Sequence, residues 1–258
     1  MAVLGEWGER LGARIGEISA SIHFLTRLPM LRHETGAGTN LAQAAWAFPL
    51  AGFVVGLVGA LVYTLADRLV LFSWPAAALA LAATMLITGA LHEDGLADTA
   101  DGCGGGDTRE RKLAIMRDSR IGTYGVCALI ISLLIRADAI ASLTETGLVA
   151  AALIAAHSGG RAAMAAVMFF LPRARSDGLS FTAGQPSAAR AALAAGIGFL
   201  IVLFCLGPAH AVVAVIVVAI VIALVAWLSL RQIGGQTGDV LGAVEQVSEI
   251  AILLVALR

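Results

Sequence analysis

The sequence has little charge and few cysteines. Only 14% of its 258 residues are charged and 59% are hydrophobic, whereas soluble domains carry about 25% charged residues. This shortage of charge excludes an ordinary soluble domain and indicates an integral membrane protein. The three cysteines (Cys103, Cys127 and Cys205) are odd in number and scattered, which argues against a disulfide framework or a cysteine metal cluster. With a net charge of −1, we expect no nucleic-acid partner.

The N-terminal thirty residues lack the clean apolar stretch of a cleavable signal peptide. Charged side chains interrupt them at Glu6, Glu9, Arg10, Arg14, Glu17 and Arg27. Residues 11–31 are apolar apart from such charges, so we expect an interfacial or re-entrant helix there.

Seven segments approach the ~20 apolar residues that a bilayer requires. They are 46–66, 72–92, 122–142, 147–171, 190–206, 209–230 and 241–257. No internal repeat or low-complexity linker is evident. The sequence therefore predicts a single all-α domain over residues 1–258, a polytopic membrane protein with about seven transmembrane helices plus the N-terminal helix.

The basic residues predict the orientation. With seven spans, one set of loops comprises the N-terminal segment, 93–121, 172–189 and 231–240. Thirteen of the 17 lysines and arginines lie in that set or at its edge, and two lie on the opposite side. This positive-inside bias predicts that the first set is cytoplasmic.

An acidic segment, His92-Glu-Asp-Gly-Leu-Ala-Asp-Thr-Ala-Asp101, follows the second span. Asp94, Asp98 and Asp101 are spaced i, i+4 and i+7, which places them on one helix face within roughly a 60° arc. Like charges so close repel, and a bound cation removes that repulsion. Hard carboxylate oxygens suit Mg²⁺, which often bridges protein and substrate phosphates. The sequence therefore predicts magnesium-dependent phosphate chemistry at a membrane surface.

A glycine-rich stretch and a basic stretch come next. Residues 102–108 either form a flexible turn or bring backbone N–H groups close to an anion; they lack the ending of a Walker A loop. The basic side chains either clamp diphosphate oxygens or contact lipid headgroups, and Asp118 lies among them. The candidates for phosphate binding are Arg109, Arg117 and Arg120.

A second acidic set occurs near the C-terminus, at Asp239, Glu245 and Glu249. A carboxylate within a span is energetically unfavourable and often functional. Two interpretations stay open: an ion pair with Arg161 or Arg136, or a second metal or substrate-binding shell, which we favour. For Arg161, an ion pair with Asp138 and a substrate contact are about equally supported.

Together these stretches resemble the cobalamin synthase family, the membrane-bound adenosylcobinamide-GDP ribazoletransferases. The motifs that carry the resemblance are Phe24-Leu-Thr-Arg-Leu-Pro29, His92–Gly102, Arg109-Glu-Arg-Lys112, Met116–Gly125 and Gly238–Glu249.

The resemblance implies a reaction in which adenosylcobinamide-GDP and α-ribazole, or its 5′-phosphate, form adenosylcobalamin or its phosphate with release of GMP. Mg²⁺ is the implied cofactor. We expect Asp94, Asp98 and Asp101 to hold it, and Asp98 to be catalytic. Arg117 and Arg120 would neutralise the leaving GMP. Asp118 or Asp239 would accept the hydroxyl proton.

Two rival functions share some of these features. A CDP-alcohol phosphotransferase also uses spaced aspartates, but its signature is only half met by Asp94-Gly-Leu-Ala-Asp98. An ion-coupled transporter would explain the intramembrane acids, but the inverted repeats frequent in transporters are not evident. The sequence does not define the oligomeric state.

Overall fold

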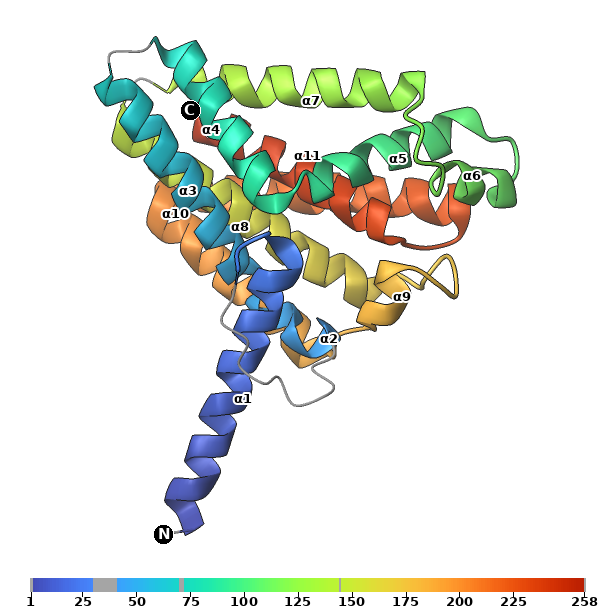
Figure 1. Ribbon diagram of the computed structural model, residues 1–258, viewed down its shortest axis with the longest axis horizontal. Helices are drawn as coiled ribbons and strands as arrows, with labels where there is room; N and C mark the ends of the chain where they lie inside the picture. The colour runs from blue at the N-terminus through green and yellow to red at the C-terminus, as the bar shows by residue number, and fades with distance from the viewer. Residues whose placement is uncertain (1, 30–40, 70–71, 144, 258) are drawn as a thin grey trace.

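The computed structural model describes residues 2–29, 41–69, 72–143 and 145–257. In these residues all regular structure is helical, apart from one isolated β-bridge. The helices, shown in Figure 1, are α1 (Ala2–Leu25), α2 (Leu41–Ala44), the 3-10 turn η1 (Ala45–Ala47), α3 (Phe48–Arg68), α4 (Ser73–Thr88), α5 (Leu91–Gly105), α6 (Arg109–Ile115), α7 (Thr123–Ser142), α8 (Thr146–Phe170), α9 (Leu179–Ala183), α10 (Ala188–Ile233) and α11 (Gly238–Ala256). The predicted all-α class is therefore confirmed for the described residues.

The structure does not confirm the predicted count of about seven spans. Among the described residues, four helical segments are long and apolar enough to cross a bilayer: Leu41–Arg68, α7, α8 and α10. Helices α4 and α5 meet at 89°. They make a fifth segment if this bent pair crosses the bilayer as one broken span. These four or five segments support a membrane protein, but they do not confirm seven spans.

The predicted segment 72–92 ends in a bend because two consecutive residues are left-handed. Gly89 has φ 68° and Ala90 has φ 57°, and such a pair ends α4 and redirects the chain into α5. Helix α1 covers most of the expected N-terminal segment 11–31, but it ends at Leu25 and extends away from the other helices (Figure 1). Its interfacial or re-entrant placement stays a prediction. Residues 30 and 31 of that expectation lie outside the described part of the chain.

Helix α10 contains a sharp break at the predicted boundary between segments 190–206 and 209–230. Gly207 has φ 79° and ψ 169°, and Pro208 follows it. That backbone region is accessible essentially only to glycine, and proline cannot donate the helical hydrogen bond. The two residues therefore divide one 46-residue helix into two arms.

Gly207→Ala is expected to destabilise the protein by about 1–3 kcal/mol, because alanine is strained in this backbone conformation. A Cβ at this position would meet no atom within 4 Å, so the loss would reflect the backbone alone. Thermal unfolding in detergent measures it. Gly196→Ala is the control, because Gly196 lies within the same helix with equally open space. Equal stability of the two variants would contradict the explanation.

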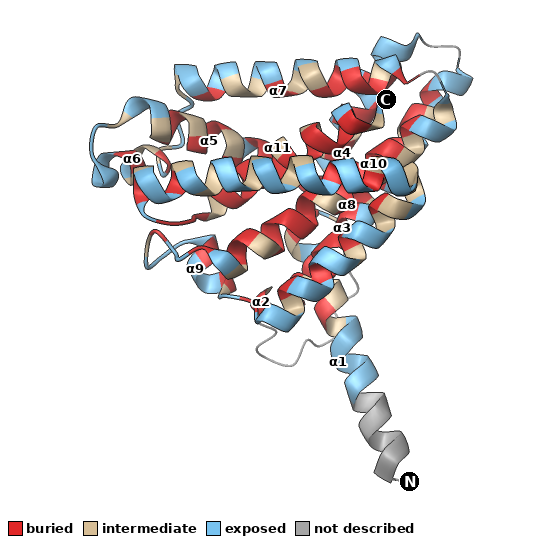
Figure 2. Ribbon diagram, turned by 180° about the vertical axis from the view of Figure 1, so that it is seen from behind, coloured by how far each residue is buried: buried red, intermediate tan, exposed pale blue. Residues whose placement is uncertain are grey.

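The helices pack closely through glycines, with α8 in the interior (Figure 2). A Cβ on Gly56 of α3 would lie 2.6 Å from the Ile154 Cα, and one on Gly160 of α8 would lie 2.9 Å from the Glu245 carbonyl oxygen. Only a residue without a side chain permits these approaches. The outward faces of α7 and α10 are exposed (Figure 2), as expected for helices that face lipid.

The connections between α5, α6 and α7, between α8 and α9, and between α10 and α11 gather at one end of the molecule, at the right of Figure 1. Gln236, before α11, donates its N–H to the Pro172 carbonyl, and its own carbonyl accepts from the Ala174 N–H. At the opposite end, Thr146 of α8 donates to the Asp67 carboxylate of α3 at 2.9 Å. Of the segments that the charge pattern assigned to one side, 93–121, 172–189 and 231–240 are therefore in contact, whereas the N-terminal helix α1 lies apart from them.

Candidate functional site

Helix α5 carries Asp94 and Asp98 into the wall of a cavity of about 440 Å³. The opposite wall comes from the segment between α6 and α7 and from α7 itself. The polar lining residues are Glu93, Asp94, Asp98, Arg117, Asp118 and Ser119. The structure thus brings four predicted site residues, two aspartates of α5 with Arg117 and Asp118, to one cavity.

Asp101, the third aspartate of the predicted face, is turned toward α7. Its Oδ2 accepts from the Gly122 N–H at 2.7 Å and its Oδ1 accepts from the Gly125 N–H at 2.8 Å. The side chain is buried, and it does not line the 440 Å³ cavity. Asp101 therefore satisfies free N–H groups in the first turn of α7 and anchors the segment that carries Arg117. Its role as a metal ligand stays a prediction.

Asp239 comes close to α5 because α5 and α11 cross at two glycines. A Cβ on Gly95 would lie 3.1 Å from the Gly242 Cα. Asp94 and Asp239 both line a smaller pocket of about 80 Å³ at this crossing. The charges of Asp94, Asp239 and Asp101 all act on Asp98. Because such a group of carboxylates repels itself, a cation among them would be stabilising.

The basic residues differ in what they contact. Arg117 lines the large cavity. Arg120 is exposed and pairs with Asp118 through two nitrogens, at 3.0 and 2.7 Å. Hydrogen bonds from Arg120 lower the pKa of Asp118 to about 2, which makes Asp118 a weak proton acceptor. Arg109 donates to the Ala174 carbonyl at 2.7 Å and so ties two loops together. Phosphate binding by Arg109 and Arg120 stays a prediction.

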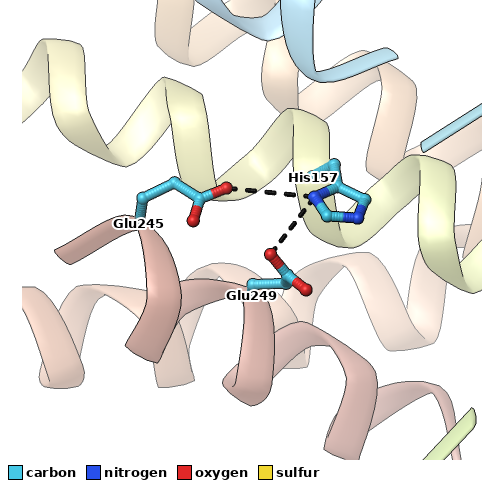
Figure 3. Close-up of side chains that lie close together, drawn as sticks. All are labelled: His157, Glu245 and Glu249. Atoms are coloured by element: carbon cyan, nitrogen blue, oxygen red, sulfur yellow. Dashed lines mark ion pairs between the residues drawn. The ribbon is translucent and has the colours of Figure 1, made fainter. Parts of the chain in front are cut away.

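The second acidic set divides in space. Asp239 lies near α5, whereas Glu245 and Glu249 are buried beside His157 of α8 (Figure 3). Possible ligand atoms of His157, Glu245 and Glu249 all lie within 4.8 Å of one another. The His157 Nδ1 lies 3.1 Å from Glu249 Oε2 and 3.9 Å from Glu245 Oε1.

Two arginines already neutralise this cluster. Arg161 donates to Glu245 Oε1 at 2.6 Å, and Arg136 lies 3.2 Å from both Glu249 and Glu93. The residues enclose essentially no free volume. The contacts therefore correspond to the ion-pair alternative for these glutamates, and their role in substrate binding stays a prediction. Asp138 is exposed on α7, so Arg161 pairs with Glu245 and not with Asp138.

Sequence reasoning missed three charged residues. Glu93 lines the large cavity and accepts a hydrogen bond from Arg136; its place in the acidic segment was a usable signal. Arg175 contacts Asp239, and Asp177 contacts Arg117. Both lie in the loop after α8, where no local pattern distinguishes them from other loop charges.

Comparison with known proteins identifies relatives over nearly the whole chain. A family model described as Cobalamin-5-phosphate synthase (CobS) matches residues 17–257. The adenosylcobinamide-GDP ribazoletransferase of Bradyrhizobium diazoefficiens is 54% identical over 242 residues, which cover 94% of this chain and 93% of that protein. Its namesake from Mesorhizobium japonicum is 50% identical over 94% and 93% of the two chains, and that from Azorhizobium caulinodans is 47% identical over 93% and 94%. No solved structure gives a significant match. The chain belongs to the cobalamin-5-phosphate synthase family.

Proposed function

We propose that this protein is an adenosylcobinamide-GDP ribazoletransferase. It transfers the adenosylcobinamide phosphate group to α-ribazole or its 5′-phosphate, releases GMP, and forms adenosylcobalamin or its phosphate. The observation that carries the proposal is 54% identity to a protein of that name over 94% of this chain. The cavity that joins Asp94 and Asp98 to Arg117 provides a place for the diphosphate.

The reaction is a displacement at phosphorus. A ribazole hydroxyl oxygen forms a bond to the cobinamide-linked phosphorus, the phosphoanhydride bond breaks, and its electron pair leaves with GMP. Such reactions depend mainly on positioning and charge neutralisation. Arg117, at the cavity wall, would neutralise the oxygens of the departing phosphate. Of the two proton acceptors considered, Asp239 fits better, because the pKa of Asp118 is held at about 2.

Asp94 and Asp98 suit a magnesium ion. Both offer hard oxygen donors at the wall of one cavity, and Mg²⁺ typically binds one or two carboxylates together with substrate phosphates. The ion would supply positive charge to the diphosphate. Asp101 would join them as a ligand only if its contacts to Gly122 and Gly125 allow it to face the same ion.

We place the cavity on the cytoplasmic side of a bacterial inner membrane, with the apolar helices in lipid. The asymmetric basic residues support this orientation. The connections that carry most of them lie at one end of the molecule (Figure 1), and the segment with Arg117 and Asp118 belongs to that end.

Purified protein tests the proposed function directly. With adenosylcobinamide-GDP, α-ribazole and Mg²⁺, we expect GMP and a cobalamin product in equal amounts. EDTA should stop the reaction and added Mg²⁺ should restore it, because a bound ion is needed to offset the charge of the diphosphate. Both products are measured by chromatography.

Two results would contradict the proposed reaction, and a third would contradict only its dependence on magnesium. Release of CMP from a CDP-alcohol, without release of GMP, would indicate a CDP-alcohol phosphotransferase. Ion-driven uptake into proteoliposomes without any nucleotide product would indicate a transporter. Full turnover in EDTA would reject the magnesium site alone.

A further inference from the structure

Arg175 follows a residue whose backbone N–H and carbonyl are both hydrogen-bonded. The residue before it, Ala174, donates its N–H to Gln236 at 2.9 Å, and its carbonyl accepts from Arg109 at 2.7 Å. These contacts hold the loop between α8 and α9 against the turn before α11. The Cα of Arg175 therefore has a defined position next to the acidic residues.

The guanidinium of Arg175 is only partly used. Its Nη2 donates to Asp239 Oδ2 at 3.3 Å, and its Nε lies 3.8 Å from Asp177 Oδ1. The side chain is 14% exposed, and Nη1 is buried without a hydrogen-bond partner. A buried N–H without a partner is unfavourable, so this nitrogen is available to an acceptor that enters the site.

Asp177 connects Arg175 to the large cavity. Its Oδ1 accepts a hydrogen bond from Nη2 of Arg117, and Arg117 lines the cavity with Asp94 and Asp98. The Asp177 side chain is 60% exposed, and exposed ion pairs contribute little to stability. A substrate anion could therefore take the place of this carboxylate between the two arginines.

We propose that Arg175 and Arg117 form a diphosphate-binding pair, which Asp177 occupies when no substrate is bound. The inference rests on the proposed function and adds residues that bind the diphosphate opposite the carboxylates. Arginine suits this task because its fork of N–H donors binds phosphate oxygens in pairs. A phospholipid headgroup offers the same oxygens, but Arg175 contacts Asp239, which lines a pocket together with Asp94, and this position beside the acidic residues favours the substrate of the proposed reaction.

The test uses the full-length protein in detergent and inorganic pyrophosphate as the probe. Calorimetry measures pyrophosphate binding without turnover, and steady-state kinetics measure the KM for adenosylcobinamide-GDP. Arg175→Gln is expected to weaken pyrophosphate binding and to raise the KM, each by at least about ten-fold, the loss expected for a hydrogen bond to a charged group. Arg173→Gln is the matched control: its side chain donates to the Phe181 carbonyl and contacts the Phe181 ring, so both values should stay within about two-fold.

Asp177→Asn provides an independent test with the opposite sign. Removal of the competing carboxylate should strengthen pyrophosphate binding by about two- to five-fold, the range expected for an exposed ion pair. If Arg175→Gln fails to fold, Arg175→Lys replaces it; it keeps the charge without the paired donors and should also bind pyrophosphate more weakly.

Each contrary outcome is distinct. Unchanged pyrophosphate binding in a folded Arg175 variant would overturn the inference, as would weaker binding in Asp177→Asn. If the Arg175 variant alters only how activity depends on phosphatidylglycerol in nanodiscs, Arg175 binds a lipid headgroup. That result would also overturn the inference. Absence of GMP release by the wild-type protein would reject the proposed function, while the binding experiment would still test Arg175.

Discussion

Asp98→Asn is expected to lower the rate of GMP release by roughly 10²–10³-fold, the loss typical for removal of a group that stabilises charge in the transition state. Asp98 lies on the cavity wall with Asp94 and Arg117, and the charges of Asp94 and Asp239 act on it. The amide keeps the size of the side chain but removes its charge, which weakens the proposed magnesium site. Turnover in detergent, together with the concentration of Mg²⁺ needed for half-maximal rate, measures the effect.

Asp107→Asn is the control for this change. Asp107 is an exposed aspartate between α5 and α6, and it does not line the 440 Å³ cavity. Asp107→Asn should retain wild-type turnover. Both variants should unfold at the wild-type temperature, because Asp107 is exposed and because relief of repulsion in Asp98→Asn offsets any lost contact. Near-normal turnover of Asp98→Asn would remove the main support for chemistry at this cavity.

Arg161→Met is expected to destabilise the protein by about 3–5 kcal/mol, because it leaves a buried carboxylate without its partner. Arg161 lies 2.6 Å from Glu245, and the two side chains are 1% and 0% exposed. The double variant Arg161→Met with Glu245→Met should recover much of the loss, because an apolar pair of similar volume can replace a buried ion pair. Thermal unfolding of the wild type, both single variants and the double variant gives the coupling energy.

This cycle decides between the two interpretations of the second acidic set. If Arg161 and Glu245 bind substrate, the single variants should be stable with a raised KM, and the double variant should show no recovery of stability. Arg231→Met is the control, because Arg231 is exposed and contacts the Trp227 ring. Its effect should stay below about 1 kcal/mol.

The buried glutamates of the second acidic set lie beside basic partners. The charges of Glu245 and Glu249 are matched by Arg161 and Arg136, which provides a structural reason for acids in this apolar interior. Burying an ion cluster is rarely the most stable solution, but it can fix how elements fit together. Here the cluster joins helices α5, α7, α8 and α11 through Glu93, Arg136, His157 and Glu249. Asp94 and Asp98 belong to the same α5, so this cluster holds the cavity wall in place.

Local periodicity predicted much of the fold. Segments 122–142 and 147–171 correspond to α7 and α8 within one residue, because the length of an apolar run depends only on neighbouring residues. The break at Gly207 and Pro208 was predictable for the same reason. The bend between α4 and α5 was not, since Ala90 adopts a left-handed conformation that alanine rarely takes on its own.

The sequence by itself determined that this is a helical membrane protein, and its motifs pointed to the family that the comparisons then showed. It also placed Asp94 and Asp98 on one helix face, because the helical period is a local property. Only the tertiary structure decided that Asp101 contacts α7 and that Asp239 of α11 lies beside Asp94 of α5. It alone also showed that Nη1 of Arg175 has no hydrogen-bond partner. These contacts join residues far apart in the chain, and they depend on how close glycines allow the helices to approach, which periodicity along one segment does not encode.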